Sequence, residues 1–537
     1  MQTRYVVVLG SLLSGLGKGV VTSSIAKILS FYGHKAMPLK FDGYLNYDCG
    51  TMNPYRHGEV FVLDDKSEVD MDFGNYERFL NVNLSGDFSL TGGKVFSAII
   101  SKERKGDFLG RDVQFIPHVT DFIIGKIEEV SKKNRLEVMV IEVGGTVGDI
   151  ENSYFIEAMR QLALKHKVVF VDVTYVPKLG AVGEQKTKPT QLALRGMMQM
   201  GINPSIIICR SESALEDGAR IKIANFANLP AESVFDDSNM QSIYELPLHL
   251  IKQGFDSRIL SSLGIGGKLD KGKLSVWENK VEKIKESLSS PNKARISIVG
   301  KYTGLHDSYV SLNEALVHAA SAVGTGIEIN WVESEDLEHG NADHLLKGSD
   351  GIIVPGGFGK RGIEGMINAI RYARENKIPY LGLCLGMQLM SIEYARNVCG
   401  LKGANSTEFN KSAKHKIIKL MESQHAVKYK GGTMRLGSWP SKIRKGTIAY
   451  GAYGKEIVFE RHRHRYEFNN SYRKKMQGNG LVISATTPNN MLVEMVEWRN
   501  SFGIGTQAHP ELKSRPESPS PLFVSFLNAA SRRRQQP

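Results

Sequence analysis

The 537-residue sequence contains no run of 18 apolar residues, and this absence argues against a membrane-spanning helix. It has only four cysteines, Cys49, Cys209, Cys384 and Cys399, whose scattered spacing argues against a disulfide framework or a zinc site. The short apolar start at residues 5–10 lacks a small-x-small cleavage site, so we interpret it as a buried strand rather than a signal segment. The sequence therefore predicts a cytoplasmic protein that does not enter a membrane.

Acidic residues are comparatively few, since 56 Asp and Glu against 69 Lys and Arg give a net charge of +13. This balance favours anionic ligands, although a solvated basic surface is the alternative. We expect nucleotides rather than nucleic acid, because neither zinc-finger spacing nor an aromatic–basic RNA signature is present. The clearest basic clusters are Arg461–Arg465 and Arg532–Arg534, and we expect the second to lie in a disordered tail.

One cysteine stands between an apolar run at residues 378–381 and a helical pattern at residues 387–398, in the sequence Gly382-Leu383-Cys384-Leu385-Gly386. Small residues two positions either side of a nucleophile are typical of a strand–turn–helix elbow, which lifts the side chain off the sheet. The N-terminal amides of the following helix favour the thiolate. A buried cysteine in an ordinary turn is the alternative.

Two further motifs favour the reactive cysteine. His509 follows an apolar stretch and can act as a base, with Glu511 orienting its imidazole. A glycine loop at residues 355–359 follows a buried-strand pattern, and its amides can stabilise an oxyanion together with the Leu385 N–H. Nucleophile, base, orienting acid and loop in this order resemble the class I glutamine amidotransferase domain.

A second glycine-rich loop, at residues 10–19, lies between a predicted strand and a helix from about Lys18 to Phe31. Backbone amides and a lysine at a helix start suit phosphate binding. Gly19 stands where a common P-loop has Ser or Thr, so acids elsewhere must hold Mg²⁺. An ordinary strand–helix turn is the alternative for this loop alone.

Candidate acids and basic loops follow along the first half. Glu142 closes the apolar strand 138–141, as a Walker-B carboxylate does, and the acidic stretch 68–72 offers further Mg²⁺ ligands. The loop 183–191 contains two lysines and two threonines and suits a triphosphate. Solvated acids and an exposed turn are the alternatives for these segments.

Short strands alternate with helices through both halves, which predicts an α/β fold of two doubly wound domains with mainly parallel sheets. We place a P-loop NTPase-like synthase domain at residues 1–265, a linker at 266–293 and a class I glutaminase domain at 294–537. A Gly- and Lys-rich stretch followed by a helix and Ser289-Ser290-Pro291-Asn292 indicates the linker.

The motifs together resemble the CTP synthase family along nearly the whole chain. The specific ones are Glu142 to Glu151, Lys186 to Gln191 and the glutaminase residues, joined by His57-Gly58-Glu59-Val60-Phe61. The resemblance implies an ATP-dependent ligase that aminates UTP to CTP through a 4-phosphorylated UTP, with ammonia from glutamine. It also implies Mg²⁺, activation by GTP, feedback inhibition by CTP and a homotetramer.

The resemblance assigns site residues by motif. For glutamine hydrolysis these are Cys384, His509 and Glu511, and for glutamine binding Gly357, Leu385, Gly386, Met387, Gln388, Glu408 and Arg465. For ATP they are Gly15, Leu16, Gly17, Lys18, Gly19, Val20, Lys40, Asp72, Ser238, Asn239 and Met240, and for Mg²⁺ Asp72 and Glu142. For UTP or CTP they are Ser14, Asp149, Ile150, Glu151, Lys186, Thr187, Lys188, Pro189, Thr190, Gln191 and Lys222.

Some positions depart from the family pattern without removing a predicted catalytic group. Gly43 and Cys49 stand where bacterial members usually have proline, and Ala508 precedes the predicted base where an aromatic residue is common. Two other functions are possible: a different P-loop enzyme with a glutaminase, such as a cobyrinate-type amidase, and a nucleotide switch or DNA-partitioning ATPase. The second leaves Cys384, His509 and Glu511 unexplained.

Overall fold

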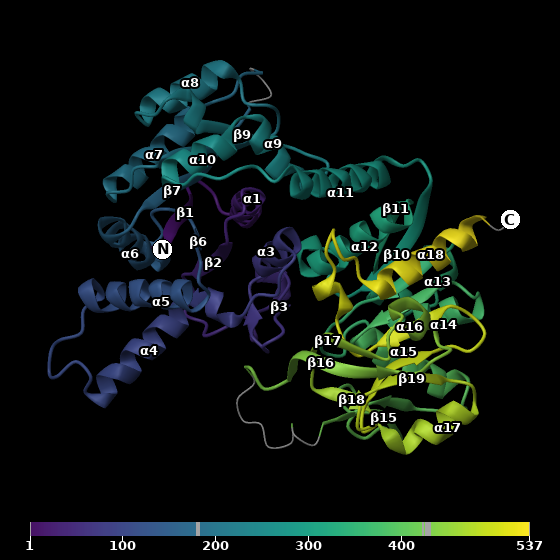
Figure 1. Ribbon diagram of the computed structural model, residues 1–537. Coiled ribbons are helices and arrows are strands. Elements are labelled where there is room, and N and C mark those ends of the chain that lie inside the picture. The colour runs from purple at the N-terminus through teal and green to yellow at the C-terminus, as the bar shows by residue number, and fades with distance from the viewer. Residues whose placement is uncertain (1, 179–182, 422–423, 425–430, 536–537) are drawn as a thin grey trace. The chain divides into compact units, whose positions relative to one another are not determined.

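The computed structural model describes residues 2–178, 183–421, 424 and 431–535 (Figure 1). The chain forms two compact units. Unit 1 comprises residues 1–49 and 75–281, and unit 2 comprises residues 50–74 and 282–537. Residues 50–74 therefore belong to the same unit as the second half of the chain, although the sequence places them within the first half.

Unit 1 is built on one seven-stranded parallel sheet in the order β5-β2-β6-β1-β7-β8-β9. The central strands are continuous runs of β-branched and other apolar residues, as expected where both faces of a parallel sheet are covered. The strands are β1 (Arg4–Gly10), β2 (Ala36–Asp42), β5 (Ser89–Thr91), β6 (Val138–Val143), β7 (Val168–Tyr175), β8 (Ile206–Ser211) and β9 (Val234–Ser238).

Helices connect these strands, and α1 with α9 and α10 packs on one core of the sheet. The helices are α1 (Lys18–Phe31), α4 (Gly92–Lys105), α5 (Thr120–Lys133), α6 (Ser153–Lys165), α7 (Lys188–Gln199), α8 (Asp217–Phe226), α9 (Leu246–Lys252) and α10 (Phe255–Leu263). Two helices, α3 (Asp72–Leu80) and α11 (Lys271–Ser289), span the boundaries between the units, and α11 lies within the segment predicted as the linker.

Unit 2 contains a nine-stranded sheet in the order β11-β10-β12-β13-β21-β20-β19-β16-β17. The first five strands are parallel: β10 (Lys293–Gly300), β11 (Gly326–Glu333), β12 (Gly351–Val354), β13 (Tyr380–Leu383) and β21 (Gly503–Thr506). The antiparallel extension consists of β16 (Arg435–Ile443), β17 (Ile457–His464), β19 (Val482–Thr486) and β20 (Val493–Glu497). Smaller sheets are β14 (Ala404–Ser406), β15 (His415–Leu420) and β18 (Tyr466–Phe468), and the hairpin β3 (Phe61–Val62) with β4 (Glu68–Val69).

Helices cover both faces of this sheet, which confirms the doubly wound α/β class (Figure 1). α14 (Ile363–Glu375) and α15 (Leu385–Asn397) contribute to one core, and α12 (Val310–Val323), α16 (Ile448–Tyr453) and α18 (Pro521–Gln535) to the other. Shorter helices are α2 (Pro54–His57), α13 (Ala342–Leu345) and α17 (Arg473–Gly478). Among the described residues, no helix is both long and apolar enough to span a bilayer.

The two basic clusters differ from what composition predicts. The expectation of a disordered tail at Arg532–Arg534 is wrong, because these residues continue α18, whose apolar face buries Phe523, Phe526 and Leu527. The alternative of a solvated basic surface does not apply to Arg461 in the other cluster, because it lies within strand β17 and is fully buried. Helix periodicity in the first case and a buried acid partner in the second explain the differences.

Candidate active site

Cys384 occupies a sharp turn between β13 and α15, as the elbow pattern predicts. Its backbone has φ 50° and ψ −95°, a conformation unusual for a residue with a side chain. The flanking glycines are required by close backbone packing: a Cβ on Gly386 would lie 2.1 Å from Val354 O, and one on Gly382 would lie 2.7 Å from the Gly386 carbonyl carbon. The turn therefore presents the thiol at the carboxyl edge of the parallel strands.

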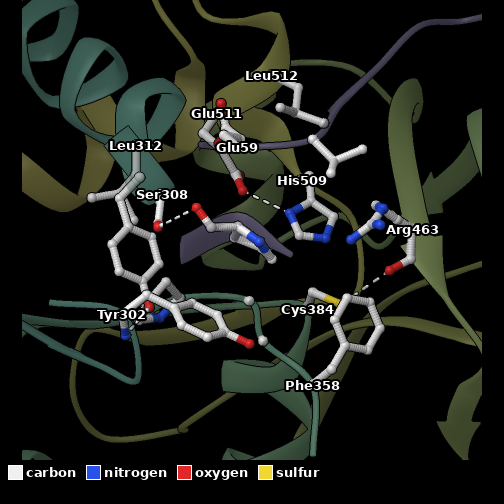
Figure 2. Close-up of a pocket in the computed structure, with 16 residues that line it drawn as sticks. Glu59, Tyr302, Ser308, Leu312, Phe358, Cys384, Arg463, His509, Glu511 and Leu512 are labelled. Carbon is white, nitrogen blue, oxygen red and sulfur yellow. Dashed lines mark hydrogen bonds and ion pairs between the residues drawn. The ribbon is translucent and has the colours of Figure 1, made fainter. Parts of the chain in front are cut away.

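Cys384, His509 and Glu511 line one pocket of unit 2, and Figure 2 shows the imidazole of His509 between the thiol and the carboxylate. His509 Nδ1 lies 2.7 Å from Glu511 Oε1, which orients the ring. Its Nε2 is buried and has no hydrogen-bond partner among the described residues. This arrangement leaves one ring nitrogen available for proton transfer, while the other is held by the acid.

Burial lowers the pKa of His509, but the negative charge of Glu511 and the neighbouring Cys384 raise that pKa well above its usual value. The raised pKa keeps the imidazole protonated near neutral pH. A cationic imidazole beside a sulfur stabilises the thiolate, which is the nucleophilic form of cysteine. Gln507 Nε2 also donates toward Cys384 Sγ at 3.6 Å.

The glycine loop 355–359 lies against both predicted catalytic groups. A Cβ on Gly356 would lie 2.8 Å from His509 Cε1, so the imidazole packs directly on this glycine. A Cβ on Gly357 would lie 3.3 Å from the Leu385 side chain at the start of α15. The loop and the first turn of α15 thus converge beside Cys384, where an oxyanion would form.

The other predicted glutamine-binding residues lie around this centre in different ways. Leu385, Gly386, Met387 and Gln388 form the buried first turn of α15, and Gln388 Nε2 donates to Tyr466 O at 3.0 Å. Glu408 accepts the Gly359 N–H at 2.9 Å, and burial raises the pKa of this carboxyl. Arg465 donates to Thr433 Oγ1 at 3.0 Å and is not among the described residues that line the pocket of Cys384.

Lys301 is a residue at this site that sequence reasoning missed. Its ammonium donates hydrogen bonds to the carbonyls of Phe358 and Gly359, so it holds the glycine loop in place. Burial lowers the pKa of Lys301 to about 8, with Glu408 opposing and Arg361 adding to the shift. The available signal was a lysine directly after the buried strand β10, at the edge where parallel sheets bind ligands.

The phosphate-type loop of unit 1 leads into α1 with Gly17 in the left-handed conformation, as the glycine pattern indicates. Lys18 Nζ donates to Gly145 O at 2.7 Å, which joins the loop to the glycines after β6. A Cβ at position 10 would lie 2.8 Å from Lys18 Nζ, so a side chain there would displace the lysine from this position. Behind the loop, Ser11 donates to the buried Asp172, whose pKa is raised by burial to about 7.

A second pocket is lined by this loop and by part of Ser238–Met240, which the resemblance assigns to ATP. It is lined by Gly15, Leu16, Gly17 and Val20 of the loop and by Ser238 and Met240 at the end of β9. Two residues that the sequence did not indicate also line it: Arg210 donates to Asn239 Oδ1 at 2.7 Å, and burial raises the pKa of Asp237 to about 6. The phosphate-type loop and the end of β9 therefore line the same pocket.

The predicted magnesium ligands are carboxylates on α3 and β6. Glu142 is buried in β6, accepts a hydrogen bond from Tyr76 and lies 3.6 Å from Lys40 Nζ. Asp72 begins α3 and belongs to unit 2, whereas Glu142 belongs to unit 1. Over the described ranges, no group of three or more His, Cys, Asp and Glu side chains is arranged to hold a metal. Oxygen ligands of this kind suit Mg²⁺ that is also bound by phosphates and water.

The predicted UTP residues are placed on loops and helix starts of unit 1. Asp149 accepts the Thr146 N–H at 2.7 Å in the loop after β6, where Ile150 is 86% exposed and Glu151 is also exposed. Lys188 and Pro189 begin α7, Thr190 donates to Tyr175 O at 2.9 Å, and Lys186 lies 2.8 Å from Glu184. Gln191 Nε2 donates a hydrogen bond to Thr187 Oγ1 at 3.3 Å. Ser14 is exposed in the glycine-rich loop, and Lys222 is exposed on α8.

Comparisons with known proteins agree with this architecture. A family model described as CTP synthase N-terminus matches residues 4–265, and one described as glutamine amidotransferase class-I matches residues 305–529. A CTP synthase from Caldanaerobacter subterraneus subsp. tengcongensis is 49% identical over 532 residues, covering 98% of each chain. A CTP synthase from Pyrococcus furiosus is 48% identical over 541 residues, covering 100% of this chain and 99% of that one.

Among solved structures, the glutaminase domain of a Trypanosoma brucei CTPS with bound acivicin is 42% identical, covers 45% of this chain and 94% of that chain, and has a TM-score of 0.42. The near-complete coverage by relatives of nearly 50% identity, with both family models in the predicted order, shows that the chain belongs to the CTP synthase family.

Proposed function

We propose how this chain carries out the reaction of its family, the glutamine-dependent conversion of UTP to CTP. Glutamine is hydrolysed at Cys384, His509 and Glu511 in unit 2, and the ammonia aminates UTP that ATP has activated in unit 1. The observation that carries the proposal is the pocket in which the strained elbow of Cys384, the imidazole of His509 and its Glu511 partner meet.

The glutaminase half of the reaction follows from that geometry. Cys384 Sγ attacks the amide carbon of glutamine, and the developing oxyanion is stabilised by amides of the glycine loop and Leu385. His509 gives its proton to the nitrogen as the carbon–nitrogen bond breaks, which releases ammonia and leaves a thioester. His509 then accepts a proton from water, which attacks the thioester and releases glutamate.

The synthase half is a phosphoryl transfer followed by a displacement. The O4 atom of UTP attacks the γ-phosphorus of ATP, and ADP leaves. Ammonia then adds to C4, and phosphate leaves with the former O4 to give CTP. Lys18 and Lys40 neutralise phosphate charge, and the residues from Gly15 to Val20 contribute backbone amides. Asp72 and Glu142 would hold Mg²⁺, which would neutralise charge on the phosphates.

Further parts of the proposal rest on the family. We assign adenine contacts to Ser238–Met240 and UTP or CTP contacts to Ser14, Asp149–Glu151, Lys186–Gln191 and Lys222. The domain ranges 1–265 and 294–537, joined by residues 266–293, are part of the same proposal. GTP as activator, CTP as feedback inhibitor, a homotetrameric assembly and a cytoplasmic location complete it.

The reaction is tested by offering the purified protein ATP, Mg²⁺ and glutamine with UTP or with other carbonyl acceptors. We expect an absorbance change from CTP only when UTP is the acceptor, together with equal amounts of glutamate and ADP. Activity on a carboxylate acceptor instead would favour a cobyrinate-type amidase. ATP hydrolysis without use of glutamine would favour a nucleotide switch, and either result would contradict the proposal.

Replacing Glu511 by Gln tests the electrostatic part of the mechanism. The carboxylate raises the pKa of His509, so the charged imidazole is fully present below the usual pKa of about 6.5 and is lost as pH rises through the higher folded value. Without that charge, burial lowers the pKa, and the alkaline limb of the profile for glutamine hydrolysis moves to lower pH. We expect kcat to fall by about 10²- to 10⁴-fold.

The measurement is kcat/KM for glutamine from about pH 6 to pH 10, a range that brackets the usual histidine pKa. The conservative Glu511→Asp variant serves as the control, since it keeps the charge. An alkaline limb that stays at the same pH in Glu511→Gln would show that Glu511 does not set the charge of His509.

A further inference from the structure

Strand β17 carries two backbone carbonyls that contact the predicted catalytic residues. Arg461 O accepts the backbone N–H of His509 at 2.7 Å, and Arg463 O lies 3.9 Å from Cys384 Sγ (Figure 2). Residues two apart in a strand have their side chains on the same face and their carbonyls in the same direction. The position of this strand therefore affects both the base and the nucleophile.

The side chains of the same two residues bind acids of residues 50–74. Arg461 Nε donates to Asp64 Oδ1 at 2.6 Å, and Arg463 Nε donates to Glu68 Oε1 at 2.8 Å. Arg461 is fully buried, Glu68 is 3% exposed, and Arg463 also donates to Gly50 O at 3.2 Å. Burial raises the pKa of Asp64, but the Arg461 guanidinium outweighs this effect and holds it below its usual value, so the pair is charged.

Both arginines also contact other parts of the glutaminase site. Arg461 donates to Leu512 O at 3.3 Å, in the turn that carries His509 and Glu511. The guanidinium of Arg463 lies 5.1 Å from the ring centre of Phe358 in the glycine loop. Through these contacts the two side chains touch the turn that carries the base and the loop predicted to bind the oxyanion.

The hairpin β3–β4 packs closely against the antiparallel extension of the sheet. Ser438 donates its N–H to Asp64 O at 3.1 Å, and a Cβ on Gly437 would lie 2.7 Å from Lys66 N and 2.8 Å from Asp64 O. The Arg461 guanidinium lies over the ring of Phe61, and its carbon is 5.3 Å from the ring centre. No side chain fits at position 437 without moving the hairpin.

The same segment supplies a wall of the pocket that contains Cys384. Pro54, Glu59 and Val60 line it, and Figure 2 shows Glu59 on the side of the pocket opposite Arg463. The Glu59 carboxylate accepts hydrogen bonds from the N–H and hydroxyl of Ser311 at the start of α12. Residues 50–74 are thus held at both the pocket wall and the strand β17.

We propose that Arg461 and Arg463 are positioning residues, which make hydrolysis of glutamine at Cys384 depend on the docking of residues 50–74 through Asp64 and Glu68. The proposal rests on the glutaminase function proposed above. A buried arginine that loses its acid must shift or take up water, and the strand shifts with it.

The test is the double variant Asp64→Asn, Glu68→Gln, which keeps the shapes of both side chains and removes their charges. We expect kcat for glutamine hydrolysis to fall by about 10- to 100-fold, because a misplacement of about 1 Å has effects of this size. KM for glutamine should change by less than about threefold, since neither acid is among the described residues that line the pocket of Cys384. The rate of Cys384 alkylation by iodoacetamide should fall, whereas CTP formation from added ammonia should persist.

The matched control is Glu393→Gln. Glu393 is fully buried on α15 and pairs with Arg374 of α14 at 2.8 Å, and neither is among the described residues that line the pocket of Cys384. The Glu393→Gln variant should leave kcat and the alkylation rate unchanged. We expect both this variant and the double variant to lower the thermal midpoint of unfolding, because each removes the charge of an acid paired with an arginine. Each single variant and Arg463→Lys are measured too, so that the test does not depend on one protein that folds poorly.

An unchanged kcat in the folded double variant, or an equal fall in Glu393→Gln, would overturn this inference while leaving the proposed function intact. A wild-type protein without glutaminase activity would overturn the proposed function itself. The two failures are therefore distinguished by the wild-type assay.

Discussion

Replacing Cys384 by Ala is expected to abolish CTP formation from glutamine and to leave CTP formation from added ammonia intact. The variant removes only the sulfur, and because alanine keeps the Cβ, the elbow retains its packing at Gly382 and Gly386. Without the nucleophile no thioester forms, and we expect a loss of about 10⁴-fold or more in glutamine-dependent activity. Ammonia reaches the activated UTP without that step, so the synthase reaction continues.

The measurement compares initial rates of CTP formation with glutamine and with ammonium chloride at alkaline pH, where more of the ammonia is unprotonated. Cys399→Ala is the matched control, since Cys399 is a partly buried free cysteine just after the same helix. Loss of both activities in Cys384→Ala would indicate a structural cysteine. Retention of both would place the nucleophile elsewhere.

Replacing Lys18 by Ala is expected to give the opposite pattern. Lys18 begins α1, is 8% exposed and joins the glycine loop to Gly145 O, so its ammonium is held where phosphate oxygens would lie. Removing one such electrostatic group costs about 10²- to 10³-fold in rate. CTP formation should fall by this factor with either nitrogen source, because phosphorylation of UTP precedes the use of ammonia.

Glutamine hydrolysis measured in the same Lys18→Ala preparation should persist, which separates the two sites. Lys35→Ala is the control for the lost charge, since Lys35 is an exposed lysine of the same unit, bonded to Asn134 O at 2.6 Å. CTP formation at the wild-type rate in Lys18→Ala would show that the loop does not bind the transferred phosphate.

Much of the α/β fold can be read from the sequence, because apolar runs bounded by glycine loops predict buried strands wherever both sheet faces are covered. Strands β1, β6, β12 and β13 and helix α1 lie within a few residues of their predicted positions. The antiparallel extension from β16 to β20 could not be distinguished in this way, since strand direction depends on connections and not on the apolar pattern alone.

Residues 50–74 belong to unit 2, a grouping that the local sequence pattern does not indicate. The segment is short, polar and without clear periodicity, so local patterns assign it to its neighbours in sequence. Its partners Arg461 and Arg463 lie 397 and 395 residues from Asp64 and Glu68, and such pairing has no local signal. The arginines themselves were visible as a basic cluster and as part of a family motif, but neither signal indicates which acids they bind.

Site residues that belong to local motifs could be predicted from the sequence, whereas those brought in by tertiary packing could not. Cys384 was indicated by its glycine spacing, and His509 with Glu511 by their position after a buried strand, because these motifs reflect local backbone geometry. Arg210 and Asp237 were not indicated, since each reaches the second pocket through the packing of separate elements. Lys301 was also missed, because its contact with the glycine loop joins residues about 57 positions apart. Which acids hold a metal together likewise depends on tertiary structure and stays a prediction for Asp72 and Glu142.

The central claim is that ammonia released at Cys384 is the nitrogen source for CTP. It is tested most directly with glutamine labelled with ¹⁵N in its amide, in the presence of UTP, ATP, Mg²⁺ and unlabelled ammonium. The account predicts ¹⁵N in the 4-amino group of CTP in the wild-type protein, and only unlabelled CTP in Cys384→Ala. Labelled CTP from Cys384→Ala, or wild-type CTP without label while glutamine is consumed, would contradict it.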